Sequence, residues 1–192
     1  GTRPSYLPAV TSGYVGHIAK FTPAGQYLFG TYTQDMRSLQ IDKYGYIYTA
    51  GKVPPIESVN ITTPGTHSQS KNGITEDVFL MKNDAMGQRI WCTYYGGAHA
   101  DVLSSMACTD SNYIYITGLT NSATGIATTG SYKAKKAVPP TGTQYDAFLA
   151  RFNAVGKLVW ATYLGTDSLT DAASVVVTPR QDAIICGSSF DI

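Results

Sequence analysis

One unit occurs three times along the 192 residues of this chain, and this repetition limits the possible folds more than any other feature. Four positions recur in each copy: a turn glycine, an aromatic residue, a tyrosine three positions later and a final glycine. In order along the chain, these residues are Gly25, Phe29, Tyr32 and Gly51; Gly87, Trp91, Tyr94 and Gly118; and Gly156, Trp160, Tyr163 and Gly187. A chain built this way is expected to fold as an array of similar modules.

Each copy contains four short runs rich in β-branched and aromatic residues, separated by Gly, Pro, Asn and Asp. This composition predicts four strands per copy, and no run has the period of a helix. In the third copy, the strands are expected near residues 147–152, 157–164, 173–178 and 183–188. The first turn of this copy begins with Asn153 and ends with Gly156, which is typical of a tight antiparallel hairpin.

Both alternating sets of residues in the run 158–164 are largely apolar, so this strand is expected to be covered on both faces. Small antiparallel sheets that are repeated in tandem and covered by their neighbours are typical of a β-propeller. We therefore predict an all-β fold, a β-propeller segment of about three four-stranded antiparallel blades. The segment 1–192 then divides into blade 1 at about 14–51, connector 52–76, blade 2 at about 77–118, connector 119–145 and blade 3 at about 146–190.

The motifs Asp146–Asn153 with Gly156, Trp91–Gly97 and Thr109–Gly118 resemble the SBBP-type bacterial β-propeller repeat over about residues 14–190. The long connectors resemble the version found in secreted and cell-surface proteins that are exported through the type IX system. The resemblance implies an extracellular or cell-surface location. Because known propellers have about four to eight blades, we expect the missing blades to come from a longer chain or from other copies.

Composition excludes some functions. Charged residues make up only 14% of the chain, and 14 basic against 13 acidic residues leave a net charge of +1, too little for nucleic-acid binding. The apolar stretches are far shorter than a bilayer requires, so membrane insertion is not expected. The three histidines, His17, His67 and His99, have no zinc-like spacing, and no nucleophile, base and oxyanion donors recur together. We expect no catalytic residue and no metal site at these histidines.

Carboxylates recur at two places in the repeat. Asp77 and Asp146 begin the first strand of their copies, and Asp101 and Asp171 align to within one residue near the third strand. Such residues commonly cap turns by accepting bonds from backbone N–H groups. Calcium binding between blades is the alternative, because Ca²⁺ prefers several oxygen ligands. We expect no cofactor, with Ca²⁺ left open.

Cys92 and Cys108 stand at symmetric positions around the second hairpin, where they are expected to be cross-strand neighbours. A disulfide between them stays open, although their equivalents in the third copy, Ala161 and Val177, form an apolar pair that favours packing. Cys186 also occupies a packing position.

Aromatic residues at the same place in every copy favour a core between blades, although an exposed array would suit sugar stacking. Binding residues are expected instead in the connectors, which differ between copies and are long enough to be functional. The candidates are Tyr132, Lys133, Lys135 and Lys136, although a solvated face is the ordinary interpretation of the lysines.

These observations predict a non-catalytic binding, adhesion or scaffolding module of a secreted or surface-exposed bacterial protein, with a protein or a surface glycan as partner. Two alternatives remain open. One is a structural subunit of a larger surface, secretion or motility assembly, in which a partner strand completes an open blade. The other is a carbohydrate-active or glycan-binding propeller.

Overall fold

The computed structural model describes residues 16–55, 61–136, 144–165 and 170–189. Within these ranges all regular structure is β-strand, and no helix is present that could cross a membrane. The twelve strands are β1 (Gly16–Phe21), β2 (Tyr27–Thr33), β3 (Asp35–Ile41), β4 (Ile47–Val53), β5 (Asp77–Asn83), β6 (Arg89–Tyr95), β7 (Asp101–Cys108), β8 (Ile114–Thr120), β9 (Asp146–Phe152), β10 (Leu158–Leu164), β11 (Ser174–Val177) and β12 (Ala183–Cys186).

Every strand pair is antiparallel, and the strands form two four-stranded and two two-stranded sheets. The four-stranded sheets have the orders β3-β4-β5-β6 and β7-β8-β9-β10, and the hairpins β1–β2 and β11–β12 form the other two. The predicted fold class is confirmed: the chain is all-β, and its four-stranded antiparallel sheets match propeller blades.

Each copy of the repeat supplies four strands, as predicted, but the four are divided between two sheets and do not form one blade. The last two strands of one copy pair with the first two of the next, so that Gly51 on β4 lies opposite Phe79 on β5, and Gly118 on β8 lies opposite Phe148 on β9. The long connectors therefore join strands within a sheet, and the short loops lead to the next sheet. The expected blade limits near 14 and 190 lie outside the described residues.

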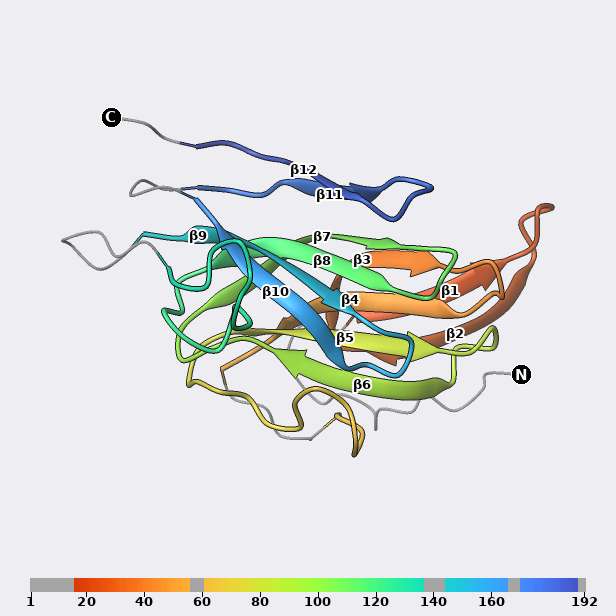
Figure 1. Ribbon diagram of the computed structural model, residues 1–192. Coiled ribbons are helices and arrows are strands. Elements are labelled where there is room, and N and C mark those ends of the chain that lie inside the picture. The colour runs from red at the N-terminus through yellow and green to blue at the C-terminus, as the bar shows by residue number, and fades with distance from the viewer. Residues whose placement is uncertain (1–15, 56–60, 137–143, 166–169, 190–192) are drawn as a thin grey trace.

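The four sheets are stacked face to face (Figure 1). The strands β3, β7 and β11 lie beside one another at the inner side of the stack, and β6 and β10 are the outermost strands of their sheets. The largest buried cluster lies between the two four-stranded sheets and includes Tyr48, Leu80, Trp91, Met106, Phe148 and Phe152. Their other faces are covered in part by the hairpins: Phe29 of β2 packs with Ile47 of β4, and Val175 of β11 packs with Tyr115 of β8.

The connectors run along the outermost strands and cover their edges. Beside β6, the backbone N–H of Tyr94 donates to the carbonyl oxygen of Ser68 at 3.1 Å, and beside β10 that of Tyr163 donates to Lys133 at 3.0 Å. These contacts place Ser68 and Lys133 at equivalent positions of the two connectors. A covered edge cannot pair with a foreign strand, which explains why the connectors are long.

The hairpin turns have the predicted geometry. In the turn between β9 and β10, Asn153 Oδ1 accepts hydrogen bonds from the backbone N–H groups of Val155 at 3.2 Å and Lys157 at 3.0 Å. Gly156 follows with a φ of +74°, a conformation that favours glycine. Asp84 accepts the equivalent bonds in the turn between β5 and β6.

None of the three cysteines forms a disulfide with another described residue. Cys92 is buried with Phe79 and Met81 on one face of its sheet, whereas Cys108 packs against the cluster between the two four-stranded sheets. The expectation that Cys92 and Cys108 are cross-strand neighbours is wrong, because β6 and β7 belong to different sheets. Both side chains serve as small apolar residues.

Candidate functional site: an open sheet face

In two copies of the repeat, the aromatic residue that precedes the tyrosine is covered by the glycine turn of the next hairpin. Trp91 on β6 is 5% exposed, and its Nε1 donates to the carbonyl oxygen of Ala154 at 2.9 Å. A Cβ on Gly156 would lie 2.9 Å from the Trp91 ring, and one on Gly87 would lie 2.6 Å from the Phe29 ring. The turn therefore fits over the aromatic side chain because it carries no side chain at this point.

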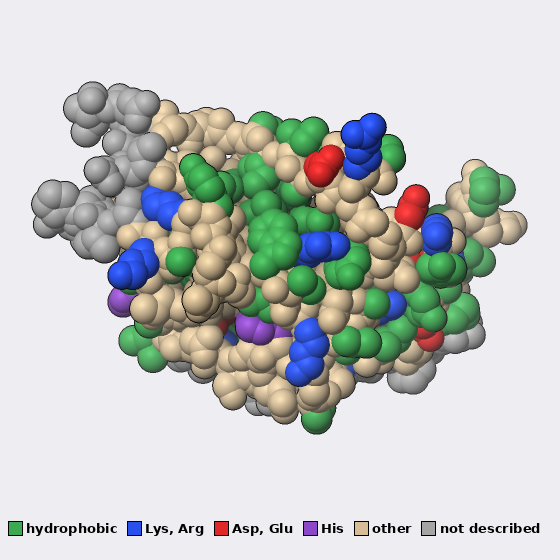
Figure 2. Space-filling model, in the orientation of Figure 1, with side chains coloured by type: hydrophobic (Ala, Val, Ile, Leu, Met, Phe, Trp, Pro, Cys, Tyr) green, Lys and Arg blue, Asp and Glu red, His purple; other side chains and the backbone are tan. Residues whose placement is uncertain are grey.

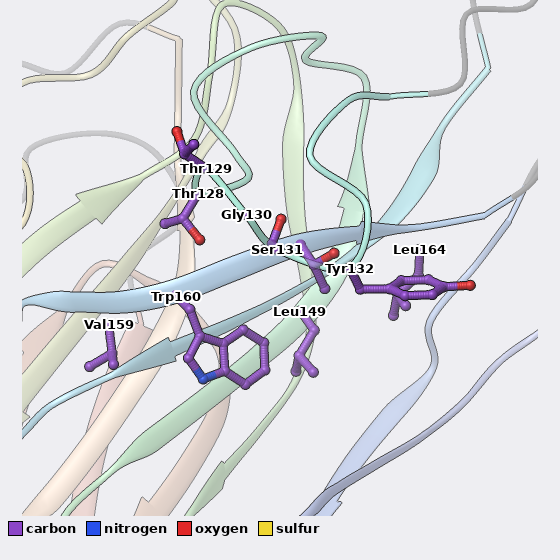
Figure 3. A pocket seen from close by; sticks show the side chains of 10 residues that line it. Thr128, Thr129, Gly130, Ser131, Tyr132, Leu149, Val159, Trp160 and Leu164 are labelled. Atoms are coloured by element: carbon purple, nitrogen blue, oxygen red, sulfur yellow. The ribbon is translucent and has the colours of Figure 1, made fainter.

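Trp160 on β10 occupies the same repeat position, but no turn in the described part of the chain lies over it. One edge of its ring meets Tyr115, with ring centroids 6.0 Å apart. The ring borders a hollow of about 530 Å³ (Figure 3). The other residues that line this hollow are Thr128, Thr129, Gly130, Ser131, Tyr132, Leu149, Val159, Thr162 and Leu164.

The connectors show the same difference between the copies. The His67 ring packs against Tyr95 and Phe152, with centroid distances of 6.1 and 5.8 Å. Tyr132 is the equivalent of His67, because it precedes Lys133 as His67 precedes Ser68. The Tyr132 side chain is 88% exposed and borders the hollow. Phe152, which packs against His67, is the last residue of β9. In the described residues no equivalent strand lies beside Tyr132.

The edge of β12 is also open. β4 and β8 each pair with the first strand of a hairpin on the side away from β3 and β7, whereas β12 pairs only with β11 among the described strands. Ala183 and Ile185 of β12 pack in the same cluster as Trp160 and Leu164, so this edge adjoins the hollow. We call the surface formed by Tyr132, Leu149, Trp160, Leu164 and the edge of β12 the open face.

Hydrophobic side chains gather near β9 and β10 in the space-filling view (Figure 2), in the region that carries the open face. An unpaired strand edge beside exposed apolar side chains is a feature of interaction surfaces. The open face can bind a strand by backbone hydrogen bonds and by burying the Trp160 ring.

At the other end of the stack, the hairpin β1–β2 exposes the repeat tyrosine that its equivalents bury. Tyr32 is 56% exposed, whereas Tyr94 is 2% and Tyr163 1% exposed. The expected aromatic core therefore includes two of the three repeated tyrosines. Tyr94 and Tyr163 pack within buried clusters, and no sheet in the described residues covers Tyr32.

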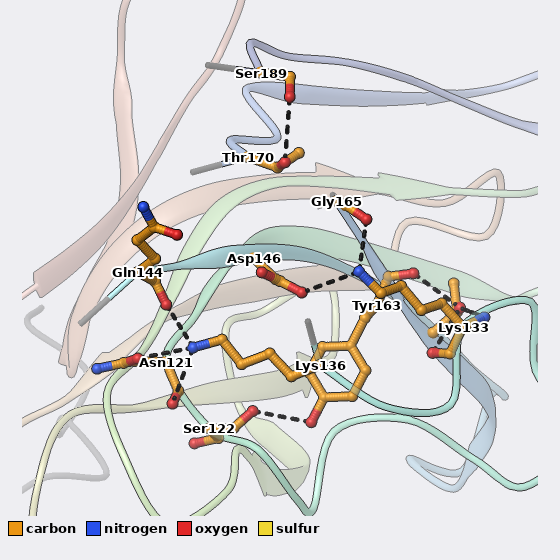
Figure 4. Close-up of polar contacts among 11 residues, drawn as sticks. Asn121, Ser122, Lys133, Lys136, Gln144, Asp146, Tyr163, Gly165, Thr170 and Ser189 are labelled. Atoms are coloured by element: carbon orange, nitrogen blue, oxygen red, sulfur yellow. Dashed lines mark hydrogen bonds and ion pairs between the residues drawn. The ribbon is translucent and has the colours of Figure 1, made fainter. Parts of the chain in front are cut away.

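Two of the connector lysines are not on a solvated face, contrary to the ordinary interpretation. Lys133 Nζ donates to the carbonyl oxygen of Gly165 at 2.6 Å and forms an ion pair with Asp146 Oδ2 at 3.4 Å (Figure 4). Lys136 Nζ donates to Asn121 Oδ1 at 2.9 Å and to the carbonyl oxygen of Gln144. Lys135 is exposed. Tyr132 is the connector candidate that lies on the open face.

His67 should make the fold less stable in mild acid. Burial, and then the nearby Lys157 charge, lower the pKa of His67 below its usual range. The unfolded chain then binds more protons below about pH 6.5, so folding is penalised as the pH falls through this range. We expect the melting temperature to drop less between pH 7.5 and 5.5 in His67→Phe than in the unchanged protein. An equal drop in both would contradict this role for His67.

No protein-family profile matches this chain. The chain is 25% identical over 140 residues to an uncharacterized WD repeat-containing protein of Acanthamoeba polyphaga mimivirus. The match covers 70% of this chain and 10% of that protein, so the chain spans about a tenth of the length of the relative it matches. Together with the stacked sheets, this similarity indicates a repeat of the β-propeller type.

Proposed function

We propose that this chain is a binding and scaffolding module of the β-propeller type, and that its open face receives a β-hairpin of its own repeat from a second copy of the chain. The observation that carries this proposal is the cover over the repeated aromatic residue. Phe29 and Trp91 are covered by the turn of the next hairpin, and Trp160 borders a hollow at the same position.

The hairpin β1–β2 has the properties of the missing cover. It is equivalent to β5–β6 and β9–β10, which complete the sheets begun by β3–β4 and β7–β8. Four large apolar side chains of this hairpin are more than half exposed: Phe21, Tyr27, Leu28 and Tyr32. Docking β1 on the edge of β12 of a second copy would satisfy both strand edges and bury apolar surface on both partners.

The name of the viral relative supports this proposal, since WD repeats form propellers and repeat arrays present extended binding surfaces. The SBBP type, the export route and the bacterial cell surface stay predictions from the sequence resemblance. A role as a subunit of a larger assembly follows if docking continues from copy to copy, because a head-to-tail contact generates a ring or a filament.

A complementation experiment tests the docking. Trp160→Arg damages the open face and keeps the hairpin, whereas Tyr32→Arg damages the hairpin and keeps the open face. We expect the unchanged protein to associate in sedimentation velocity at micromolar concentration and each variant alone to be monomeric. An equimolar mixture of the two variants should give dimers, because one intact face then meets one intact hairpin.

Ile74→Arg is the matched control. Ile74 lies in the first connector, is 88% exposed and belongs to neither proposed surface, so this variant should associate as the unchanged protein does. A protein that stays monomeric at 100 µM, or association that survives both Trp160→Arg and Tyr32→Arg, would refute docking of a second copy.

The hollow also supports a glycan-binding alternative. The exposed aromatic ring of Tyr132 and the exposed Thr129 line it, and these groups suit stacking and hydrogen bonding to a sugar. A glycan array probed with the monomeric Tyr32→Arg variant separates the two functions. Binding that is lost in the double variant Tyr32→Arg/Tyr132→Ala would favour the glycan, and an array without signal would remove this alternative.

A further inference from the structure

The structure contains two equivalent junctions. At each of them, three parts of the chain meet: the start of a hairpin, the end of the same hairpin and the segment that leads to the next inner strand. The first junction contains Asp77, Gly96 and Asp101, and the second contains Asp146, Gly165 and Thr170. In the first, the N–H of Asp101 donates to the carbonyl oxygen of Glu76 at 2.8 Å, and in the second that of Thr170 donates to Tyr145 at 3.2 Å. Asp101 is thus equivalent to Thr170, the residue just before Asp171.

The second junction is electrically balanced. Its carboxylate, Asp146, is 2% exposed, and the Lys133 ammonium lies between this carboxylate and the carbonyl oxygen of Gly165 (Figure 4). The Thr170 hydroxyl lies 3.5 Å from the Ser189 hydroxyl and adds no charge. One buried anion is therefore paired with one cation.

The first junction holds two carboxylates in the same space. Asp77 is 1% exposed and Asp101 is fully buried. A Cβ on Gly96 would lie 2.9 Å from Asp77 Oδ1 and 2.8 Å from Asp101 Oδ2, so the two carboxylates approach one point. The position of Lys133 is taken by Ser68, whose hydroxyl donates to the carbonyl oxygen of Ser70.

Neutral groups bond to both carboxylates, and the Thr120 side chain is among those that hydrogen-bond to Asp101. Asp77 Oδ2 accepts from the Asn72 N–H at 3.2 Å, and Asp101 Oδ2 accepts from the Gly97 N–H at 2.7 Å and the Ser122 hydroxyl at 3.0 Å. Asp77 Oδ1, which faces this point, is buried without a hydrogen-bond partner in the described residues.

The nearby cations do not enter the junction. Lys71 acts on Asp77 at longer range, and its Nζ donates to the carbonyl oxygen of Pro54 at 2.5 Å. Lys136 lies near Asp101 as well, and its ammonium donates to Asn121 Oδ1.

Two buried carboxylates without a cation are unfavourable, because each loses its hydration and repels the other. Burial, and further the Asp101 charge, raise the pKa of Asp77 to about 7. A divalent cation would balance the two charges as the ammonium balances the single charge of the second junction. No group of three or more acidic, His or Cys side chains gathers in the described residues, so the remaining ligands would be neutral oxygens.

We propose that the first junction binds Ca²⁺ between Asp77 and Asp101, at the place that the Lys133 ammonium holds in the second junction. Ca²⁺ fits because it takes carboxylate and carbonyl oxygens in flexible geometry, and the unpartnered Asp77 Oδ1 and the facing Asp101 Oδ2 supply two of them. The Gly96 carbonyl oxygen, which accepts from Asn72 Nδ2 at 2.8 Å, lies in the same junction. The ion would tie together the start of β5, the end of β6 and the start of β7.

Thermal unfolding with and without calcium tests this site. Addition of 1 mM CaCl₂ after EDTA treatment should raise the melting temperature of the unchanged protein by about 5 °C or more, since a ligand that binds only the folded state stabilises it. Titration calorimetry with CaCl₂ should give one site per chain. Asp101→Asn should lose both the shift and the heat of binding.

Ser68→Lys is the decisive variant, because it places an ammonium where Lys133 has one. We expect this variant to melt higher than the unchanged protein in EDTA and to gain nothing from calcium. Asp146→Asn, the same change at the second junction, should keep the calcium shift and serves as the control. These readouts do not depend on association, and they can be repeated in monomeric Trp160→Arg.

Two results would overturn the proposal. One is an equal melting temperature of the unchanged protein in EDTA and in CaCl₂. The other is a calcium shift that persists in Asp101→Asn. If calcium has no effect and Asp101→Asn raises the melting temperature, the two carboxylates share a proton instead.

Discussion

Gly118→Ala is expected to destabilise the fold by more than about 3 kcal/mol. Gly118 is buried in β8, opposite Leu103 at the point where the register of β7 shifts. A Cβ at this position would lie 2.0 Å from the carbonyl oxygen of Val102, a distance that no relaxation of side chains can relieve. The inner strand would have to move away, and its hydrogen bonds would break.

Urea unfolding followed by circular dichroism measures this effect. Gly130→Ala is the matched control: Gly130 has a φ of +79°, and a Cβ there would meet no atom within 4 Å. Gly130→Ala should lower the free energy of unfolding by only about 1 kcal/mol, because the substitution strains the backbone and causes no clash. A Gly118→Ala variant that is as stable as Gly130→Ala would show that the bulge opposite Gly118 is not rigid.

Trp91→Ala should mainly lower stability, whereas Trp160→Ala should mainly abolish association. Trp91 is buried in the cluster between the four-stranded sheets, so its removal leaves a cavity and should cost about 3–5 kcal/mol. Trp160 is half-buried beside the hollow, and its removal should cost about 2 kcal/mol or less. Only Trp160→Ala removes a side chain that docking would cover.

Unfolding curves and sedimentation velocity on the same samples separate these effects. Trp91→Ala, where it is folded, should associate as the unchanged protein does, and Trp160→Ala should be folded and monomeric. Equal loss of stability in the two variants would mean that Trp160 is already covered, in conflict with an open face. Retained association in Trp160→Ala would place the contact elsewhere.

Local pattern was sufficient to predict the strands and their turns. The runs of β-branched and aromatic residues mark β9 and β10 within one residue at either end, and Asn153 with Gly156 marks the turn between them. Strand formation and turn geometry depend on residues a few positions apart, which the sequence displays directly.

The candidate site could be predicted only in part. Tyr132 was found because it lies in a connector that differs between copies, and Trp160 was identified as a repeat residue. No local signal distinguishes Trp160 from Trp91, since each stands between two small or medium-sized apolar residues and three positions before a tyrosine. Their difference arises from the next hairpin, which covers Trp91 and, in the described residues, has no counterpart over Trp160.

The sequence by itself determined that this chain consists of antiparallel strands in three repeated sets with apolar residues on both faces, because alternation and turn chemistry are local properties. Only the tertiary structure decided which strands share a sheet. β4 pairs with β5 across a long connector, and such pairing depends on contacts that are distant in sequence. Likewise, only the fold brings Lys133 to Asp146 and leaves Asp77 beside Asp101, because burial and charge pairing are set by neighbours in space.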